Sequence, residues 1–451
     1  MRISVVVFSL FVFDISFADV QAESIRSALA AAYTGNPTLN AQRAATRAND
    51  ESLVQAKSDF RPTAFLTGNA AKRYSNTDLG GSSSTTPWGY GIEINQNLFN
   101  GFRTVNNIRA AKASILASRE TLRNVEQNVL LSAVQAYVSV VQAKALLDIR
   151  RRNISFLREQ LRSSDARLEV GEGTGTDVAQ SRSQLELARA QLSSARANLS
   201  AAQASYRQTI GRNPSGTSWP RGPRKLPSGT EQAIKIAGFN HPAIRAASHA
   251  VDAALFNVKT SEGAFLPTVD AQVTATRNYN STGVQGNSSR SAQAGVSVRV
   301  PLYQGGAASS AVRQNKQLLS QNRIQVDEQH NAVRQEVVTA FTSLQSARAN
   351  LNANRAQISA ARLALSGVVE ERNVGQRTQL DVLLAQSSVL QAEELAVQSR
   401  GSAIVAGYRL LAAIGRLNSH RLNLHVAHYS PKKHFKAVKD RWFGLRTPSG
   451  N

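Results

Sequence analysis

The sequence of 451 residues contains no cysteine, a single methionine and few aromatic residues, which make up 6% of the chain. Without cysteine there is no disulfide framework, and no thiol is available for an N-terminal lipid anchor. Alanine, serine, glutamine, arginine and leucine dominate instead, as they do in long helical and coiled-coil proteins. The sequence also lacks the HExxH and GxSxG motifs and a credible catalytic triad, so we expect no enzyme, no cofactor and no metal.

The sequence also has few acidic residues. It contains 30 aspartates and glutamates against 53 lysines and arginines, which gives a net charge of +23. Such a balance usually indicates a polyanionic partner, but the charge is spread out and concentrates only in residues 416–451. That tail holds eight basic residues against Asp440, a net of +7, and we expect it to be solvated. Four histidines share the tail, and we favour scattered side chains over a weak metal site there: His420, His425, His428 and His434.

Long hydrophobic runs are confined to the N-terminus. Arg2 precedes an apolar run over residues 3–17, and small residues permit cleavage after Ala18 or Ala22, so residues 1–22 are predicted to be a secretory signal peptide. We expect no later stretch to approach the ~18–20 apolar residues of a membrane-spanning helix. If the mature protein crosses a membrane, it must therefore do so as strands.

What the sequence does contain is a duplication. LFNG at 98–101 returns as LYQG at 302–305, 204 positions later, and VGEGTGTDV at 170–178 returns as VGQRTQLDV at 374–382. A linker rich in proline, glycine and serine separates the copies. The predicted organisation is a first repeat at 23–211, a linker at 212–230, a second repeat at 231–415 and the basic tail.

Each repeat carries two stretches in which apolar and polar residues alternate, the pattern of an amphipathic strand. The polar tips between them, 75–87 and 280–290, belong in water. Strands of about 10 residues fit a tilted transmembrane strand, but four strands leave two unpaired edges that lipid does not tolerate. We therefore expect several copies of the chain to complete one barrel, using strands at 60–74, 86–98, 265–279 and 291–302.

Long helices follow the strands. Residues 102–170 contain no glycine or proline, and a helix of that length spans about 100 Å. Leucine and isoleucine recur there every seven residues, as in Leu147 and Ile154, which predicts a left-handed coiled coil. We predict helical hairpins at 102–210 and 306–414, with tight turns at Gly171 and Gly375.

The signal peptide, the duplicated strand pairs and hairpins, and the two glycine turns together resemble the TolC family of outer-membrane efflux and secretion channels. The resemblance covers about residues 23–415. It implies a mixed α and β homotrimer in the outer membrane of a Gram-negative bacterium. Four strands per chain would form a twelve-stranded β-barrel, continuous with a long periplasmic α-helical coiled-coil barrel. Gly101 and Gly305 would then supply backbone freedom where strand becomes helix, although a plain strand-to-helix loop accommodates the same residues.

The resemblance also implies a periplasmic mouth that is narrowed after the second turn. Asp381 matches one acidic ring, whereas the position three residues later, acidic in the best-known pattern, is Leu384 here. Arg377 matches a linking arginine, Thr176 and Asp177 match its partners on the first hairpin, and Arg372 replaces an aromatic linker and would pair bidentately with Asp177. A capping box alone also explains Asp177 and Asp381, and GEGTG at 171–175 is a turn instead of a phosphate loop, because it lacks the lysine.

The function that follows is a passive exit duct for drugs or secreted proteins. Its expected partners are two further copies of itself, a periplasmic adaptor protein, an inner-membrane RND or ABC transporter and outer-membrane lipid. The alternatives are a periplasmic coiled-coil scaffold or adaptor without a pore and a basic nucleic-acid-binding coiled coil. Secretion makes nucleic acid the poorest partner, and an adaptor normally lacks duplicated amphipathic strands.

Overall fold

The computed structural model describes residues 23–77, 81–223, 225–281, 286–448 and 450, so the predicted signal peptide at 1–22 lies outside the described residues. The chain divides into two compact units, and both take segments from each sequence repeat. The first unit comprises Met1–Ala32, Ser132–Gly222 and Arg348–Val405. The second comprises Tyr33–Leu131, Pro223–Ala347 and Ala406–Asn451.

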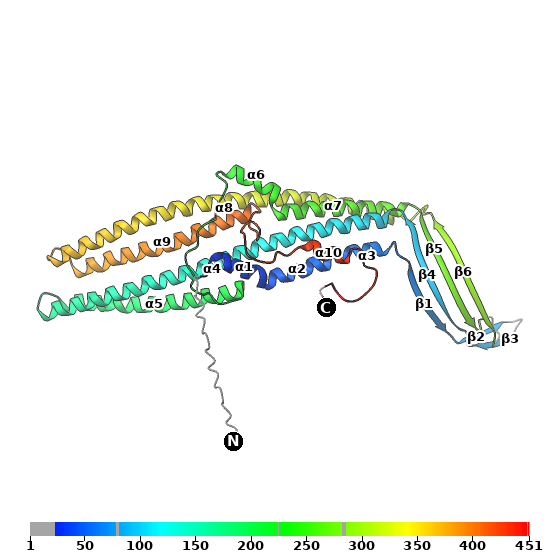
Figure 1. Ribbon diagram of the computed structural model, residues 1–451, viewed down its shortest axis with the longest axis horizontal. Helices are drawn as coiled ribbons and strands as arrows, with labels where there is room; N and C mark the ends of the chain where they lie inside the picture. The colour runs from blue at the N-terminus through cyan, green and yellow to red at the C-terminus, as the bar shows by residue number, and fades with distance from the viewer. Residues whose placement is uncertain (1–22, 78–80, 224, 282–285, 449, 451) are drawn as a thin grey trace, which may run out of the picture. The chain divides into compact units, whose positions relative to one another are not determined.

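Two helical hairpins dominate the chain (Figure 1). Helices α4 and α8 have 67 residues each, or about 100 Å at ~1.5 Å per residue. Their shorter partners begin directly after the glycine turns. The four helices are α4 (Arg103–Glu169), α5 (Gly175–Ile210), α8 (Ala307–Asn373) and α9 (Gln379–Ala413).

A small cluster of aliphatic side chains packs the helices of the first unit together. One layer joins α4, α5 and α9 through Ile154, Leu185 and Leu383, with Leu161 and Leu192 partly buried against them. The seven-residue repeat therefore marks contact positions, as in a coiled coil. A core of this kind extends along the hairpins because each layer needs only a few aliphatic side chains.

Helix α4 also corrects the expectation about apolar stretches. By length and composition it is the one helix among the described residues that could cross a membrane, with an 18-residue window of mean hydropathy 1.4. Half of that window is buried inside the chain, as in the core helix of a soluble protein, so the composition is a weak indication of a span.

The second unit contains a four-stranded antiparallel sheet in the order β1-β4-β5-β6 (Figure 1). Its central pair, β4 with β5, joins a strand of the first repeat to a strand of the second. Prolines set several of the limits, because Pro62 and Pro267 lie directly before β1 and β5 and cannot donate to a ladder. The strands are β1 (Thr63–Ala70), β4 (Trp88–Asn100), β5 (Thr268–Tyr279) and β6 (Ser288–Arg299).

All four strands differ from their predicted bounds: β4 begins and ends two residues later than the predicted 86–98, and β6 begins and ends three residues earlier than the predicted 291–302. The stretch expected as one strand over 60–74 ends at Ala70, and the polar tip expected as a loop contains a two-stranded ribbon, β2 (Arg73–Thr77) with β3 (Gly81–Thr85). The strand expected from 265 starts three residues later, because a 3₁₀ turn (Gly263–Phe265) precedes it. Serine and threonine in the tip pair through their backbones, which the alternation of apolar side chains does not reveal.

One face of the sheet is apolar and exposed. Across the ladder, Leu66 pairs with Ile92, Ile92 with Ala275, and Ala275 with Ala292. The side chain of Leu66 is 80% exposed although it is wholly apolar. An exposed apolar face of this kind marks a surface that contacts lipid or protein. At the end of the sheet near the ribbon, Trp88 stacks on Tyr279 with ring centroids 4.1 Å apart, an arrangement typical of the aromatic girdle of a membrane barrel.

Shorter helices flank the sheet and the hairpins, and the tail forms one of them. Helix α10 (Pro431–Val438) lies on α2, which corrects the expectation of a solvated tail. Its His434 Nδ1 lies 3.0 Å from Oδ2 of the buried Asp50, and Arg119 approaches the other oxygen at 3.5 Å. The other helices are α1 (Ile25–Gly35), α2 (Pro37–Asp50), α3 (Ser52–Ser58), α6 (Thr230–Asn240) and α7 (Pro242–Glu262).

The tail histidines do not gather around a metal position. His420 stacks on His428 with ring centroids 3.7 Å apart, and His434 is engaged with Asp50. Among the described residues no group of three or more His, Cys, Asp or Glu side chains is arranged to hold a metal ion. Ring stacking and a hydrogen-bonding contact therefore account for His420, His428 and His434.

The junction between β4 and α4 requires a glycine for two reasons. Gly101 has φ 66°, and a Cβ placed there would lie 2.3 Å from the carbonyl oxygen of Gly263. Gly305, at the second junction, has φ 62° and meets no described atom within 4 Å. Gly101 is therefore required both by its backbone conformation and by the lack of space for a side chain. Within this chain, Gly305 is required by its backbone conformation alone.

We expect Gly101→Ala to destabilise the protein more than Gly171→Ala, by about 1–3 kcal/mol. Both glycines have positive φ, which costs an alanine about 1–2 kcal/mol, but Gly171 has no described atom within 4 Å of a Cβ. Thermal unfolding of the detergent-solubilised variants measures the difference. Equal losses of melting temperature would show that the contact with Gly263 is immaterial.

Candidate functional site

The two hairpin turns have the same backbone geometry, and Figure 1 shows them at the same end of the hairpins. Gly171, two residues after the end of α4, has φ 76°, and Gly375, two residues after the end of α8, has φ 83°. In both turns the amide after the glycine donates to a carbonyl five residues back, Glu172 to Arg167 and Gln376 to Glu371, each at 2.9 Å. This Schellman arrangement satisfies the last carbonyls of each long helix and reverses the chain.

A threonine and an aspartate then start each short helix. Thr174 Oγ1 accepts from the amide of Asp177 at 3.2 Å, and Asp177 Oδ2 accepts from the amide of Thr174 at 3.2 Å. Thr378 and Asp381 repeat the pair, at 3.2 Å and 2.9 Å. The amide and then the hydroxyl of Thr378, followed by the charge of Arg377, hold the pKa of the exposed Asp381 carboxyl below its usual range. Both aspartates thus have a structural capping role, and Asp381 keeps its negative charge in water.

The two arginines of the second turn have partners on their own hairpin. Arg377 Nε donates to Glu371 at 2.8 Å in a half-exposed ion pair. Arg372 is buried and donates to Gln379 Oε1 at 2.9 Å and to Asn373. Burial, and then the nearby charge of Arg167, lower the pKa of Arg372. The predicted links from these arginines to Thr176 and Asp177 are not among the contacts made within the described chain, and they stay a prediction.

Gln379 is the residue that the sequence analysis missed. It is the first residue of α9, is buried, and reaches the other hairpin: its Nε2 lies 3.3 Å from Ser181 Oγ on α5 and 3.4 Å from Gln160 Oε1 on α4. Ser181 in turn lies 3.2 Å from Ser164. These five side chains, which we call the polar link, form a buried hydrogen-bonded bridge between the hairpins: Gln160, Ser164, Ser181, Arg372 and Gln379. Polar residues at positions of the seven-residue repeat that face neighbouring helices could have indicated this bridge from the sequence.

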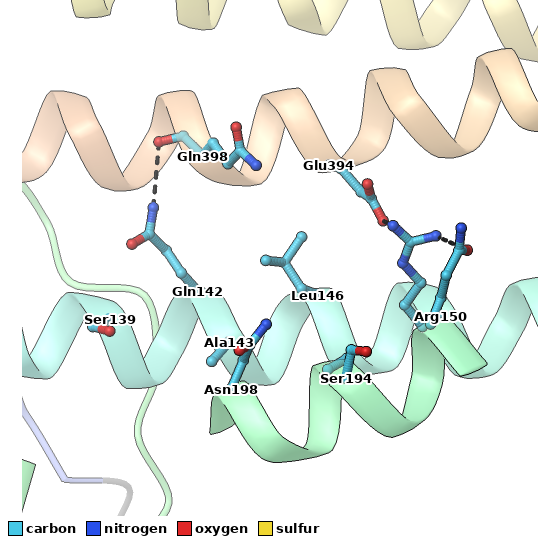
Figure 2. A pocket seen from close by; sticks show the side chains of 11 residues that line it. Ser139, Gln142, Ala143, Leu146, Arg150, Ser194, Asn198, Glu394 and Gln398 are labelled. Atoms are coloured by element: carbon cyan, nitrogen blue, oxygen red, sulfur yellow. Dashed lines mark hydrogen bonds and ion pairs between the residues drawn. The ribbon is translucent and has the colours of Figure 1, made fainter. Parts of the chain in front are cut away.

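Farther from the turns, α9 carries a pair of glutamates that bind arginines of the first hairpin. Arg150 of α4 lies 2.6 Å from Glu394 and also donates to Gln191 of α5 (Figure 2). Beside them, Gln142 donates to the Gln398 carbonyl at 3.3 Å, and the side chains surround a cavity of about 450 Å³. Burial raises the pKa of Glu394, and the Arg150 charge opposes that shift.

The predicted site residues thus fall into two groups. One lies at the hairpin turns of the first unit, where Leu384 is an exposed apolar side chain one turn after Asp381. The other lies at the strand–helix junctions of the second unit. The first group comprises Gly171, Thr176, Asp177, Arg372, Gly375, Arg377, Asp381 and Leu384; the second comprises Gly101 and Gly305.

The comparisons with known proteins agree with this architecture. The profile of the outer membrane efflux protein family matches residues 28–212 and again 233–416. Outer membrane efflux protein BepC of Brucella suis is 44% identical, over 95% of this chain and 93% of its own. Outer membrane protein TolC of Escherichia coli is 24% identical, over 89% and 84%.

Among solved structures, the Campylobacter jejuni CmeC outer membrane channel superposes with a TM-score of 0.79 at 16% identity, covering 94% of this chain and 90% of its own. The Neisseria gonorrhoeae MtrE outer membrane channel gives 0.72 at 19% identity, covering 87% and 89%. At such identities the likeness shows the fold alone. The resemblance to the TolC family is confirmed, and the chain belongs to the outer membrane efflux protein family as an outer-membrane channel with a periplasmic part.

Proposed function

We propose that three copies of this chain close one barrel, with β1 of each copy pairing with β6 of the next. The observation that carries the proposal is the four-stranded sheet with an exposed apolar face and, among the described residues, two unpaired edges. In lipid, unpaired backbone groups cost several kcal/mol each, so an open sheet of this kind needs closure. Three sheets give twelve strands, within the size range of membrane barrels.

The barrel and hairpins would then form a passive duct for drugs or secreted proteins. It would connect through a periplasmic adaptor to an inner-membrane transporter of the RND or ABC type, which supplies the energy. The name of the 44% identical relative specifies efflux. Two relatives at 22–23% identity are named for protease secretion, AprF of Pseudomonas aeruginosa and PrtF of Dickeya chrysanthemi. The greater similarity to BepC favours efflux of small molecules over export of proteins.

The periplasmic mouth would be shaped by the second turn. Three Asp381 carboxylates around one axis would favour cations, and the exposed Leu384 beside each would replace a second acidic ring with an apolar one. The polar link would hold the two hairpins of each copy together. Opening requires the hairpins to separate, so the buried hydrogen bonds of Gln379 would oppose it.

The proposed pore and assembly are tested together. We expect the detergent-solubilised protein to have the mass of three chains by light scattering and to conduct ions in planar bilayers. A periplasmic scaffold would instead be extracted without detergent. A lone, non-conducting subunit would overturn the proposal.

Asp381→Asn should lower the preference for cations over anions severalfold, because it removes the ring of charge but keeps a side chain of the same size. Asp177→Asn is the matched control, since it alters the equivalent cap on the first hairpin. The reversal potential under a salt gradient measures the effect. Since the Thr378 cap lowers the pKa of Asp381, the preference should persist as pH falls through the range in which an ordinary aspartate protonates. If Asp381→Asn and Asp177→Asn changed the preference for cations equally, the ring of Asp381 carboxylates would not be the source of that preference.

Gln379→Ala should raise single-channel conductance, as should replacement of Arg372 and Arg377 by glutamine. Loss of the Gln379 amide leaves buried Ser181 and Gln160 with one partner fewer, at a cost of about 1–3 kcal/mol to hairpin contact. Gln376→Ala, at an exposed position of the same turn, is the control and should leave conductance unchanged. If Gln379→Ala conducts like the control, the polar link has no part in closing the mouth.

A further inference from the structure

The residues after α10 bring the end of the chain to the start of the sheet. Arg61 Nη1 donates to the Arg441 carbonyl at 2.8 Å, and its guanidinium lies 4.7 Å from the centre of the Trp442 ring. Arg61 is two residues before Thr63, the first residue of β1. Lys57, at the end of α3, pairs with Asp440 at 2.8 Å. Trp442 is therefore fixed beside the strand–helix end of the sheet.

This segment is exposed and apolar where it faces away from the protein. Trp442 is 67% exposed, Phe443 90% and Leu445 fully exposed. Single exposed apolar residues are ordinary, but three within four positions make a patch. No folding requirement explains it, because only Trp442 has a described ring contact with the rest of the chain.

Basic side chains surround the patch. Arg441 and Arg446 flank it, and the only acidic residue after α10, Asp440, is neutralised by Lys57 and Lys439. Helix α10 buries Val438 and half-buries His434 and Phe435 on its inner side. Its outer side exposes three lysines: Lys432, Lys433 and Lys436.

The position of the patch relative to a bilayer follows from the sheet. The long hairpins are periplasmic, so the strand–helix end of the sheet is its periplasmic end, and Trp88 with Tyr279 mark the opposite end. Other exposed apolar side chains lie at the same strand–helix end, among them Phe60 and Tyr303. Aromatic and basic residues together are the chemistry of a membrane–water interface.

We propose that the segment after α10, residues 439–446, is an interfacial anchor that inserts Trp442, Phe443 and Leu445 into the periplasmic leaflet of the outer membrane. Arg441, Arg446 and the α10 lysines contact anionic phospholipid headgroups. The ligand is a bilayer surface rather than a second copy of this chain, because a partner with a net charge of +23 is a poor match for a basic patch.

The test follows Trp442 in the full-length protein. The chain has three tryptophans, so Trp88→Phe with Trp219→Phe leaves Trp442 as the single reporter. The protein is reconstituted into phosphatidylcholine vesicles with or without phosphatidylglycerol, using lipids brominated on the acyl chain. We expect the bromines to quench Trp442, more strongly with phosphatidylglycerol, and acrylamide quenching to fall accordingly. Lys432→Gln with Lys433→Gln and Lys436→Gln should weaken the dependence on phosphatidylglycerol, because only Arg441 and Arg446 then remain to contact the headgroups.

Two outcomes would overturn the anchor. Full access to acrylamide without quenching by bromine would mean that the segment is solvated. Protection from both quenchers, equally in detergent, would mean that another copy of the chain covers it.

A second variant separates lipid contact from protein stability. Phe443→Ser with Leu445→Ser should abolish the rise in melting temperature that phosphatidylglycerol confers, and should leave the melting temperature in neutral detergent unchanged. Loss of stability in neutral detergent would show that these side chains pack against protein, which also contradicts the proposal.

Discussion

Backbone hydrogen bonding at the outer strands is the constraint on which the rest of this structure depends. Each amide and carbonyl that faces lipid needs a partner, and a sheet of four strands leaves β1 and β6 with one open edge each among the described residues. The apolar face of the same sheet, with Leu66 and Ile92 exposed, places these edges in lipid instead of water. In the proposed three-chain barrel, assembly would therefore be part of folding, because only a neighbouring copy can pair these edges.

The helical hairpins are stabilised in a different way from the sheet. Because the hairpins are about 100 Å long, no single core can stabilise them, and each layer must be satisfied separately. An aliphatic layer at Ile154 and Leu185 packs α4, α5 and α9 together, and polar layers lie elsewhere along the same helices. The polar link has members on α4, α5, α8 and α9, and Arg150 of α4 binds both Glu394 of α9 and Gln191 of α5, so these contacts fix which helices meet at a given level. We infer that these ionic and polar layers help to specify the register of the helices.

Local chemistry explains which features the sequence predicts. A run without glycine or proline marks α4 to within a residue or two, and a run interrupted only by Gly367 marks α8; the paired turns follow from glycine, threonine and aspartate at fixed offsets. The capping of Asp177 and Asp381 is equally local. Strand limits are harder to predict, since the β2–β3 ribbon pairs a strand that includes Arg73 and Asn76 with a strand of glycine, serine and threonine, and neither carries an alternating apolar pattern.

Features that depend on contacts between distant segments escaped prediction. Helix α10 has the composition of a charged tail, and its docking depends on distant partners: the buried Asp50, 384 positions before His434, and Arg119, which lies over the Phe435 ring. Gln379 reads as one polar residue among many until Gln160 and Ser181 are brought beside it, 219 and 198 positions away. Neither relation has a local signature, because the periodicity of a helix fixes its inward face but not the residues it meets.

The duplication itself gives a final argument about assembly. The two repeats align so that Gly263, before β5, corresponds to Ser58, before β1. Within the chain, the Gly101 junction is enclosed by Gly263 because β4 and β5 are neighbours. The equivalent junction at Gly305 follows the edge strand β6 and meets no described atom within 4 Å. If the pattern of the first junction is repeated around a ring, the space beside Gly305 is filled by the Ser58 segment of the next copy. Gly305, which also has a positive φ, would then be the counterpart of Gly101. The two junctions would differ within one chain because only the next copy supplies the contact beside Gly305.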